Sequence, residues 1–216
     1  MMKDTVIFDL DGTLLNTLDD LADGVNAALE YMKFPKRTLE EVRCFVGNGM
    51  RMLVNRAVPV GTSDEMTEST FKYFCEYYFA HCNEKTAPYN GIMQMLTELV
   101  KLNYKLAVVS NKRIEAVKEL CHRYFGMITV MSGDQPGMRR KPAADGIENV
   151  LRQLNSEKSS AVYVGDSEVD VLTAENAGID CISVTWGFRT ERELLDNGAA
   201  NLISYPNELL ELLNKF

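Results

Sequence analysis

The segment Thr5-Val6-Ile7-Phe8-Asp9-Leu10-Asp11-Gly12-Thr13-Leu14 joins a strand-forming run to two closely spaced carboxylates and a glycine. Its first four residues are β-branched or aromatic and predict a buried strand. Asp9 and Asp11 are two positions apart, so we expect their carboxylates to meet in one pocket if the strand geometry persists. Adjacent carboxylates are costly unless a cation joins them or one takes up a proton. The pair indicates a metal site or a nucleophile beside a general acid, and a solvated Asp-Gly turn is the alternative.

Composition places the chain among ordinary globular proteins. Its 216 residues are 46% apolar and 25% charged, and they are numerous enough to bury a core in one or two domains. The formal net charge of -8 argues against general binding of nucleic acid, which needs a basic face. A small anionic substrate stays compatible with this charge, because the local field in a cleft can oppose it.

The cysteines and the apolar runs bear on location. None of the five cysteines belongs to a C-x-x-C pair, so we expect reduced thiols rather than a disulfide framework. The N-terminal residues lack the apolar region and cleavage site of a signal peptide, and no apolar run is long enough to cross a bilayer. These features predict a cytoplasmic protein with no membrane partner.

Outward from the first segment, residues 16–85 predict helices only. Apolar residues recur there at three- and four-residue spacing. Thr17 is expected to begin the first helix, and Thr38 with Glu41 matches a capping box at the start of the second. The expected helices cover residues 18–32, 38–45, 50–58 and 63–82.

From residue 88 onward, strand and helix patterns alternate, which predicts a parallel sheet covered on both faces. The expected strands cover residues 105–109, 127–131, 161–164, 181–184 and 200–203. The helices between them are expected over residues 91–102, 113–124, 142–154 and 168–177, with a last helix from residue 206. We therefore predict an α/β fold in which residues 1–15 and 86–216 form a Rossmann-like parallel sheet core with helices on both faces. Residues 16–85 form an inserted all-helical domain.

Polar residues gather where the expected strands end. In open α/β sheets the ligand lies at the carboxyl ends of the strands, so these residues predict one shared site. They are Asp9, Asp11 and Gly12 after the first strand, Ser110 and Asn111 after the second, and Asp166 with Asp170 after a later one. Lys141 falls in a loop before a helix and adds a positive charge.

Four segments resemble the four motifs of the haloacid dehalogenase superfamily, in the same order. They are Asp9-Leu10-Asp11-Gly12-Thr13, Ser110-Asn111, Lys141-Pro142 and Gly165-Asp166-Ser167-Glu168-Val169-Asp170. The inserted helices match the cap domain of that superfamily, which follows the first motif directly. The resemblance extends over nearly the whole chain and implies phosphoryl transfer. The presence of the second aspartate, Asp11, fits the phosphate-transferring members rather than the dehalogenases.

The resemblance implies three catalytic residues. Asp9 is the expected nucleophile, which forms an aspartyl-phosphate. Asp11 is the expected general acid, which protonates the leaving oxygen and then activates water. Lys141 is expected to neutralise charge on the phosphoryl oxygens as it develops.

The resemblance also implies ligands for metal and phosphate. Mg is the expected cofactor, held by Asp9, the backbone carbonyl of Asp11 and Asp166, with Asp170 holding the shell of metal-bound water. These are hard oxygen donors, which Mg prefers. The expected phosphate-binding residues are Gly12, Ser110, Asn111 and Lys141.

A narrower resemblance concerns the substrate. Phe45-Val46-Gly47-Asn48-Gly49-Met50 resembles the cap of phosphoglycolate phosphatases. The expected specificity residues are Gly47, Asn48, Gly49, Arg51 and Arg113. The alternative interpretation is an interhelical turn for the glycines and a solvated face for the arginines.

The expected function is therefore a Mg-dependent phosphatase that hydrolyses a small phosphomonoester, such as 2-phosphoglycolate, through an aspartyl-phosphate intermediate. The partner is a small phosphorylated metabolite, and the choice between monomer and homodimer stays open. The alternatives are a β-phosphoglucomutase-like phosphotransferase, a pyrophosphatase and a non-catalytic phospho-receiver module.

Overall fold

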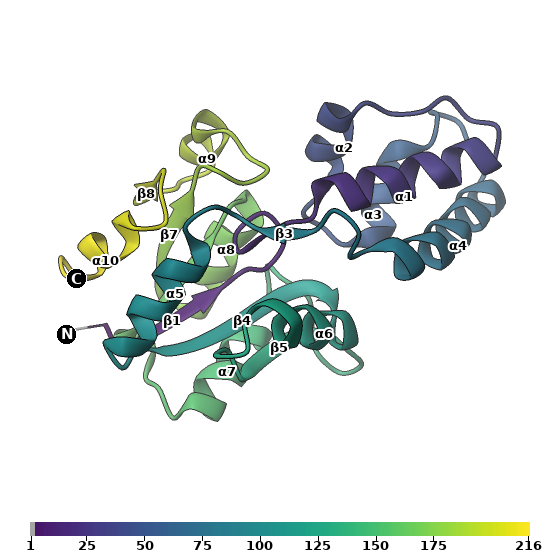
Figure 1. Cartoon of the computed structure of the whole chain (residues 1–216). Coiled ribbons are helices and arrows are strands. Elements are labelled where there is room, and N and C mark those ends of the chain that lie inside the picture. Colours follow the sequence, from purple (N-terminus) through teal and green to yellow (C-terminus); the bar gives the residue numbers. More distant parts are fainter. Residues whose placement is uncertain (1–2) are drawn as a thin grey trace. The chain divides into compact units, whose positions relative to one another are not determined.

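A computed structural model describes residues 3–216 of the chain (Figure 1). The strand expected before Asp9 is present in it as β1 (Thr5–Phe8). β1 pairs in parallel with β4 (Lys105–Arg113) on one side and with β6 (Ala161–Gly165) on the other. β5 (Val130–Asp134) extends the sheet beyond β4, and β7 (Asp180–Val184) and β8 (Leu202–Ile203) extend it beyond β6. These pairings are all parallel, which confirms the predicted α/β sheet.

The sheet and its helices form one of two compact units of the chain. This core unit comprises the residues up to Leu14 together with Pro88–Phe216, and the helical unit comprises Leu15–Ala87. The helices of the core unit are α5 (Ile92–Lys101), α6 (Ile114–Tyr124), α7 (Asp145–Leu154), α8 (Glu168–Ala177), α9 (Glu191–Asp196) and α10 (Glu208–Leu213), with a 3-10 turn at Lys158–Ser160.

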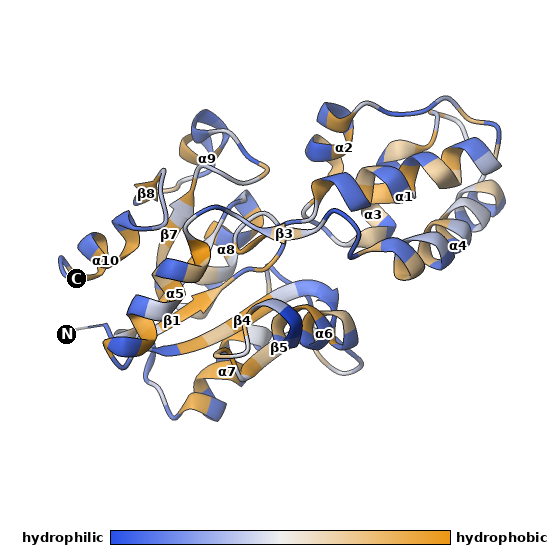
Figure 2. Ribbon diagram, in the orientation of Figure 1, coloured by the Kyte–Doolittle hydropathy of each residue, from blue (hydrophilic) through white to orange (hydrophobic). Residues whose placement is uncertain are grey.

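Helices cover both faces of the sheet, as predicted. Ile7, Val109 and Tyr163 belong to one buried cluster with apolar residues of α7 and α8. Because successive strand residues point to opposite faces, Val6 and Phe8 face the other way, and both are fully buried. In Figure 2 the ribbons of β1 and of the middle of β4 are orange, as expected of strands that are covered on both sides.

Three elements of the core unit differ from their predicted bounds by three residues or more. β4 continues through Ser110 and Asn111 to Arg113, with a shift of register after Val109. β5 begins at Val130 rather than at 127, because Ile128 is a buried residue of the turn after α6 instead of a strand residue. α7 begins at Asp145 rather than at Pro142, because the backbone of Lys141 is held by the side chain of Asn111.

The helical unit has its own apolar core. Its helices are α1 (Leu18–Tyr31), α2 (Leu39–Phe45), α3 (Met50–Ala57) and α4 (Asp64–His81). The core includes Val25, Leu29, Leu53, Phe74 and Tyr78. The predicted capping box is confirmed: Thr38 Oγ1 accepts from Glu41 N–H, and Glu41 accepts from Thr38 N–H at 2.7 Å.

Short strands mark the two points where the chain passes between the units. β2 (Leu15–Asn16) and β3 (Ala87–Pro88) form a two-stranded sheet that the sequence did not predict, because two residues carry no periodic pattern. Inside the helical unit, the buried carboxylate of Asp20 on α1 accepts from the N–H groups of Lys85 and Thr86 at 2.9 and 2.8 Å. The start of α1 and the last residues of the unit are thus bonded together.

The chain shows no helix within residues 3–216 that combines the length and the apolar character needed to span a membrane. None of its five cysteines forms a disulfide bond.

Candidate active site

The parallel register brings polar residues to one edge of the sheet. Phe8 pairs with Val108 of β4 and with Val164 of β6, so the residues that follow these three lie side by side. The N–H of Asp9 still donates to Val164 O at 2.8 Å. The chain leaves β1 for β4 on one side and later returns to β6 on the other, and such a switch point is where open α/β sheets bind their ligands.

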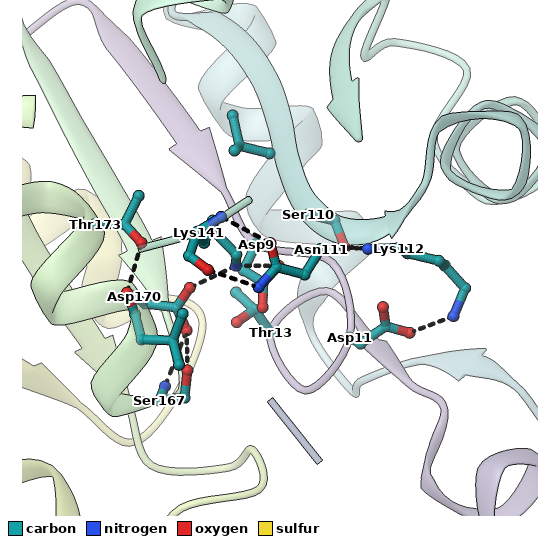
Figure 3. Close-up of polar contacts among 12 residues, drawn as sticks. Asp9, Asp11, Thr13, Ser110, Asn111, Lys112, Lys141, Ser167, Asp170 and Thr173 are labelled. Atoms are coloured by element: carbon teal, nitrogen blue, oxygen red, sulfur yellow. Dashed lines mark hydrogen bonds and ion pairs between the residues drawn. The ribbon is translucent and has the colours of Figure 1, made fainter. Parts of the chain in front are cut away.

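Asp9, Asp166 and Asp170 form a buried acidic cluster at this edge. Figure 3 shows two of them, Asp9 and Asp170. One carboxylate oxygen from each of the three lies within 4.8 Å of the others. Thr13 Oγ1 donates to one oxygen of Asp166 at 3.2 Å, and Phe188 N–H donates to the other at 2.7 Å. These donors hold Asp166 in one orientation.

Asp170 is held differently from the other two carboxylates. Its Oδ2 accepts from the N–H and the hydroxyl of Ser167 at 3.0 and 2.6 Å and from Asp166 N–H at 3.2 Å, in a capping box at the start of α8. Its Oδ1 accepts from Lys141 Nζ at 2.7 Å. Asp170 thus accepts more protein hydrogen bonds than Asp166, and its side chain is fully buried, which suits it to orienting its neighbours rather than to direct contact with a ligand.

Lys141 supplies the positive charge of the cluster. Its Nζ lies 2.8 Å from Asp9 Oδ1 and 2.7 Å from Asp170 Oδ1, and its side chain is only 5% exposed. Burial disfavours the ammonium, but the charges of Asp170 and Asp9 outweigh that effect and raise the pKa of Lys141 well above its usual range. Lys141 is therefore a permanent cation at this position.

The carboxylates of the cluster carry more negative charge than one lysine can balance. Burial raises the pKa of Asp9 well above its usual range; Lys141 opposes this rise, and the charges of Asp170 and Asp166 add to it. Burial and the charge of Asp170 raise the pKa of Asp166 to about 7. Ionisation of all three carboxylates would leave two negative charges beside the Lys141 ammonium, which a divalent cation would neutralise.

Three glycines make room for the acidic cluster. A Cβ added at Gly12 or Gly187 would overlap Asp166, and one added at Gly165 would overlap Asp170. Gly12 also has a φ of +90°, in the region that favours glycine. The oxygen donors of the cluster and the negative charge that they carry when ionised fit Mg²⁺.

Replacing Gly12 by Ala is expected to lower the free energy of unfolding by about 1–3 kcal/mol, because φ is positive there and the new methyl group meets the carboxylate of Asp166. Urea unfolding of the variant measures this change. Gly126→Ala is the matched control, since its φ is not positive and a Cβ there meets nothing within 4 Å. Equal stability of the two variants would contradict the strain at Gly12.

Asp11 does not join the cluster, contrary to the expectation that its carboxylate would meet that of Asp9. β1 ends at Phe8, so the alternation of an extended strand does not reach Asp11. The Asp11 carboxylate instead accepts from Lys112 Nζ at 2.9 Å, as Figure 3 shows. The side chain of Lys112 is 6% exposed, so this is a largely buried ion pair.

Ser110 and Asn111 lie at the same edge of the sheet but have protein partners. Ser110 Oγ accepts from Lys112 N–H at 3.1 Å. The amide of Asn111 donates to Lys141 O at 3.1 Å and accepts from Lys141 N–H at 2.8 Å. Asn111 thus fixes the backbone of Lys141, and contact of either residue with phosphate stays a prediction.

Three residues at the site were not among the predicted site residues. Lys112 follows Asn111 directly and was open to detection as a charge at a strand end. Tyr163 lies within the apolar strand β6, where an aromatic residue is ordinarily core. Arg189 forms two hydrogen bonds to the carboxylate of Glu168, at 2.8 and 3.2 Å. The sequence alone does not predict that these two residues pair.

The five expected specificity residues fall in both units. Gly47 and Gly49 have φ values of 124° and 83°, and Asn48 Oδ1 between them accepts from Arg56 Nη2 at 2.6 Å. A further set of contacts involves the two arginines: Arg51 pairs with Glu68 at 2.7 Å and lies 4.1 Å from the ring centroid of Phe71, and Arg113 pairs with Glu115 at 3.4 Å. Arg113 belongs to the core unit, and the other four belong to the helical unit.

The fold and the site together define a doubly wound α/β protein with a buried polar centre at the switch point of its sheet. The chain belongs to the haloacid dehalogenase-like hydrolases, because the model of that family matches residues 6–184.

Individual relatives narrow the comparison. The chain is 33% identical over 216 residues to phosphoglycolate phosphatase 1 of Pseudomonas aeruginosa, covering 95% of this chain and 78% of that protein. It is 32% identical over 215 residues to phosphoglycolate phosphatase of Pseudomonas savastanoi, with the same coverage. A solved structure from Lactobacillus delbrueckii, described as a candidate phosphoglycolate phosphatase, has a TM-score of 0.94 at 33% identity and covers 99% of each chain. These relatives confirm the predicted family, its phosphoglycolate phosphatase-like branch and the enzyme class, a phosphoric monoester hydrolase.

Proposed function

We propose that this protein is a Mg²⁺-dependent phosphatase that hydrolyses a small phosphomonoester through an aspartyl-phosphate on Asp9. The observation that carries the proposal is the buried cluster of Asp9, Asp166 and Asp170 around Lys141, at the carboxyl ends of the central strands. A carboxylate nucleophile, a cation beside it and further acidic groups are what phosphoryl transfer from an ester to an aspartate requires.

In the first step, a carboxylate oxygen of Asp9 attacks phosphorus, and the bond between phosphorus and the ester oxygen breaks. The leaving alkoxide takes its proton from Asp11, which requires the Asp11 side chain to turn away from Lys112. Lys141 beside Asp9 offsets the repulsion between the attacking carboxylate and the phosphate dianion.

In the second step, water attacks the phosphorus of the aspartyl-phosphate while Asp11 accepts a proton from that water. The bond between phosphorus and Asp9 breaks, which releases inorganic phosphate and restores the carboxylate. Asp11 thus returns to its protonated form after giving a proton and taking one back.

Asp9, Asp166 and the backbone carbonyl of Asp11 would hold Mg²⁺, with Asp170 orienting the surrounding groups. When bound, Mg²⁺ supplies positive charge that stabilises the phosphoryl oxygens and lowers the pKa of neighbouring acids. Phosphate oxygens would be held by Ser110, Lys141 and the N–H of Gly12, and Asn111 would act by fixing Lys141.

We further propose that the substrate is 2-phosphoglycolate and that the helical unit acts as a cap that recognises the leaving group. The relatives named phosphoglycolate phosphatases support this choice. Gly47, Asn48, Gly49 and Arg51 of the helical unit, with Arg113 of the core unit, are the proposed specificity residues. Arg51 is paired with Glu68 in the structure, and it would exchange this partner for the substrate carboxylate.

With Mg²⁺ present, we expect kcat/KM for phosphate release to be highest with 2-phosphoglycolate. The panel to measure contains 2-phosphoglycolate, pyrophosphate, β-glucose 1-phosphate, other sugar phosphates and nucleotides. A preference of at least about 100-fold, or about 2.7 kcal/mol in transition-state binding, is expected if an arginine pairs with the carboxylate. Arg51→Gln should reduce this preference, whereas Arg43→Gln, which removes a helical-unit arginine paired with Glu40, should not.

Other outcomes of the same panel discriminate among the remaining functions. Weak release from many compounds would retain the phosphatase and reject the glycolate substrate. Fast release from pyrophosphate alone would indicate a pyrophosphatase. Conversion of β-glucose 1-phosphate to glucose 6-phosphate without release would indicate a phosphotransferase of the mutase type. Phosphorylation of Asp9 without release of phosphate would indicate a non-catalytic phospho-receiver module.

We propose the cytoplasm as the location, because five cysteines without a disulfide bond are typical of a reducing compartment.

A further inference from the structure

Tyr163 is a fully buried residue in the middle of β6, next to Ile7 of β1. Its ring packs in the apolar cluster between the sheet and helices α7 and α8. Its hydroxyl, however, lies within hydrogen-bond distance of three polar groups: Lys141 Nζ at 3.1 Å, Val109 O at 3.0 Å and Asp170 Oδ1 at 3.2 Å. A side chain that looks like core therefore ends inside the polar cluster.

The donors of Lys141 can be assigned completely. A lysine ammonium has three N–H donors and no acceptor. Lys141 Nζ has three oxygen partners in the structure, namely Asp9 Oδ1 at 2.8 Å, Asp170 Oδ1 at 2.7 Å and Tyr163 Oη at 3.1 Å. Two of these partners are carboxylates, and the third is neutral.

The neutral partner, Tyr163, connects the ammonium to two other elements of the core unit. Tyr163 accepts from Lys141 while its own proton goes to Val109 O or to Asp170 Oδ1. The hydroxyl is thereby tied to β4 as well as to the start of α8. Lys141 is in turn fixed at its backbone by Asn111, which precedes Lys112 on β4.

We propose that Tyr163 is a positioning residue that holds the Lys141 ammonium in place for phosphoryl transfer. When phosphate binds beside Asp9, the N–H of Lys141 that points to Asp9 becomes available to a phosphoryl oxygen at that place. Asp170 and Tyr163 hold the other two N–H groups, so the ammonium keeps its position and its orientation. Without the hydroxyl, the ammonium has two carboxylates as its only protein partners among the described residues and is drawn toward them, away from the phosphoryl oxygens. This inference rests on the proposed phosphatase function.

The test is Tyr163→Phe, which removes the hydroxyl and keeps the ring. Lys141 Nζ lies 5.7 Å from the centroid of the ring, so the packing beneath the ammonium is retained. We expect kcat for 2-phosphoglycolate to fall about ten- to a hundredfold while KM changes less than about threefold. The reason is that Lys141 acts on charge that develops in the transition state, and a misplaced donor affects that state most.

Two inhibitors separate positioning from a general structural effect. Orthovanadate mimics the five-coordinate transition state, whereas inorganic phosphate mimics the product. We expect the inhibition constant of vanadate to rise by the same factor as kcat falls, and that of phosphate to change little. Unchanged kcat and vanadate affinity would overturn the inference. A fall in activity that follows only the loss of folded protein, with normal vanadate affinity, would also overturn it.

Tyr104→Phe is the matched control, because Tyr104 lies in the core unit just before β4, at the opposite end of the strand from the site. This variant should leave kcat and the inhibition constant of vanadate unchanged.

A spectroscopic measurement tests the inference independently of turnover. In a ¹⁵N-labelled protein, a buried hydrogen-bonded ammonium gives an observable ¹H–¹⁵N signal, which Lys141→Arg identifies by its disappearance. Tyr163→Phe should shift or broaden that signal, and an unchanged signal would overturn the placement of Lys141 by Tyr163. If wild-type protein releases no phosphate from any compound, the proposed function fails, and the signal still decides whether Tyr163 holds Lys141.

Discussion

Replacing Asp9 by Asn is expected to lower phosphate release by about four orders of magnitude or more, because an amide cannot displace the ester oxygen from phosphorus. The variant also loses one of the two carboxylates that pair with Lys141. Steady-state release from 2-phosphoglycolate at saturating Mg²⁺ measures the effect. In wild-type protein, rapid acid quenching followed by mass spectrometry should locate the phosphoryl group on the peptide that contains Asp9.

Two comparisons make the Asp9 result interpretable. Asp9→Ala excludes recovery of the carboxylate by deamidation of Asn, and thermal unfolding of both variants shows that the fold persists. Asp11→Asn retains the nucleophile but not the acid, so it should turn over slowly and still show the phosphoryl group on Asp9. Wild-type rates in Asp9→Asn would remove the nucleophile from the mechanism, and an adduct on another residue would reassign it.

The second large effect concerns the metal. At a concentration about 100 times its dissociation constant, Mg²⁺ is expected to raise the unfolding midpoint of the core unit by about 5–10 °C. Binding at that level stabilises the folded state by roughly 2.7 kcal/mol, and each kcal/mol shifts the midpoint of a chain of this size by about 2–4 °C. The physical reason is that Asp9, Asp166 and Asp170 are buried together, and the ammonium of Lys141 offsets only part of their charge.

Differential scanning calorimetry with and without Mg²⁺ measures this shift. Asp166→Asn should abolish the shift, because it removes a proposed ligand. Glu98→Gln should retain it, because Glu98 is an exposed residue of α5 that pairs with Lys101. Sodium chloride at matched ionic strength controls for screening of surface charge. A shift of the same size in Asp166→Asn would mean that Mg²⁺ binds elsewhere.

The parts of the fold that repeat a simple pattern were predictable. The run Thr5–Phe8 is a strand in the structure because β-branched and aromatic residues fit a sheet that is covered on both faces. Thr38 and Glu41 form their capping box because it depends only on residues three positions apart. Asp9, Asp166 and Asp170 come together because parallel strands place their carboxyl ends at one edge.

The parts that depend on contacts between distant residues were not predictable. Asp11 follows a strand that ends earlier than the pattern suggests, and its partner Lys112 is 101 positions away. The sequence shows Tyr163 as one more apolar strand residue, since only the folded chain brings its hydroxyl to Lys141. The bounds of β4 and β5 shifted because a bulge and a buried turn residue, Ile128, replace regular pairing there.

The bond between Asp20 and the backbone of Lys85 and Thr86 has a consequence for how this architecture changes over evolution. Because the inserted segment starts and finishes at adjacent points of its own structure, its length places no demand on the distance between β1 and α5. An insertion of another size closes with almost the same entropy, since closure depends only weakly on length. The helical unit is in this sense an exchangeable module, which can be replaced by an insertion of another size while the strand order of the α/β core stays the same.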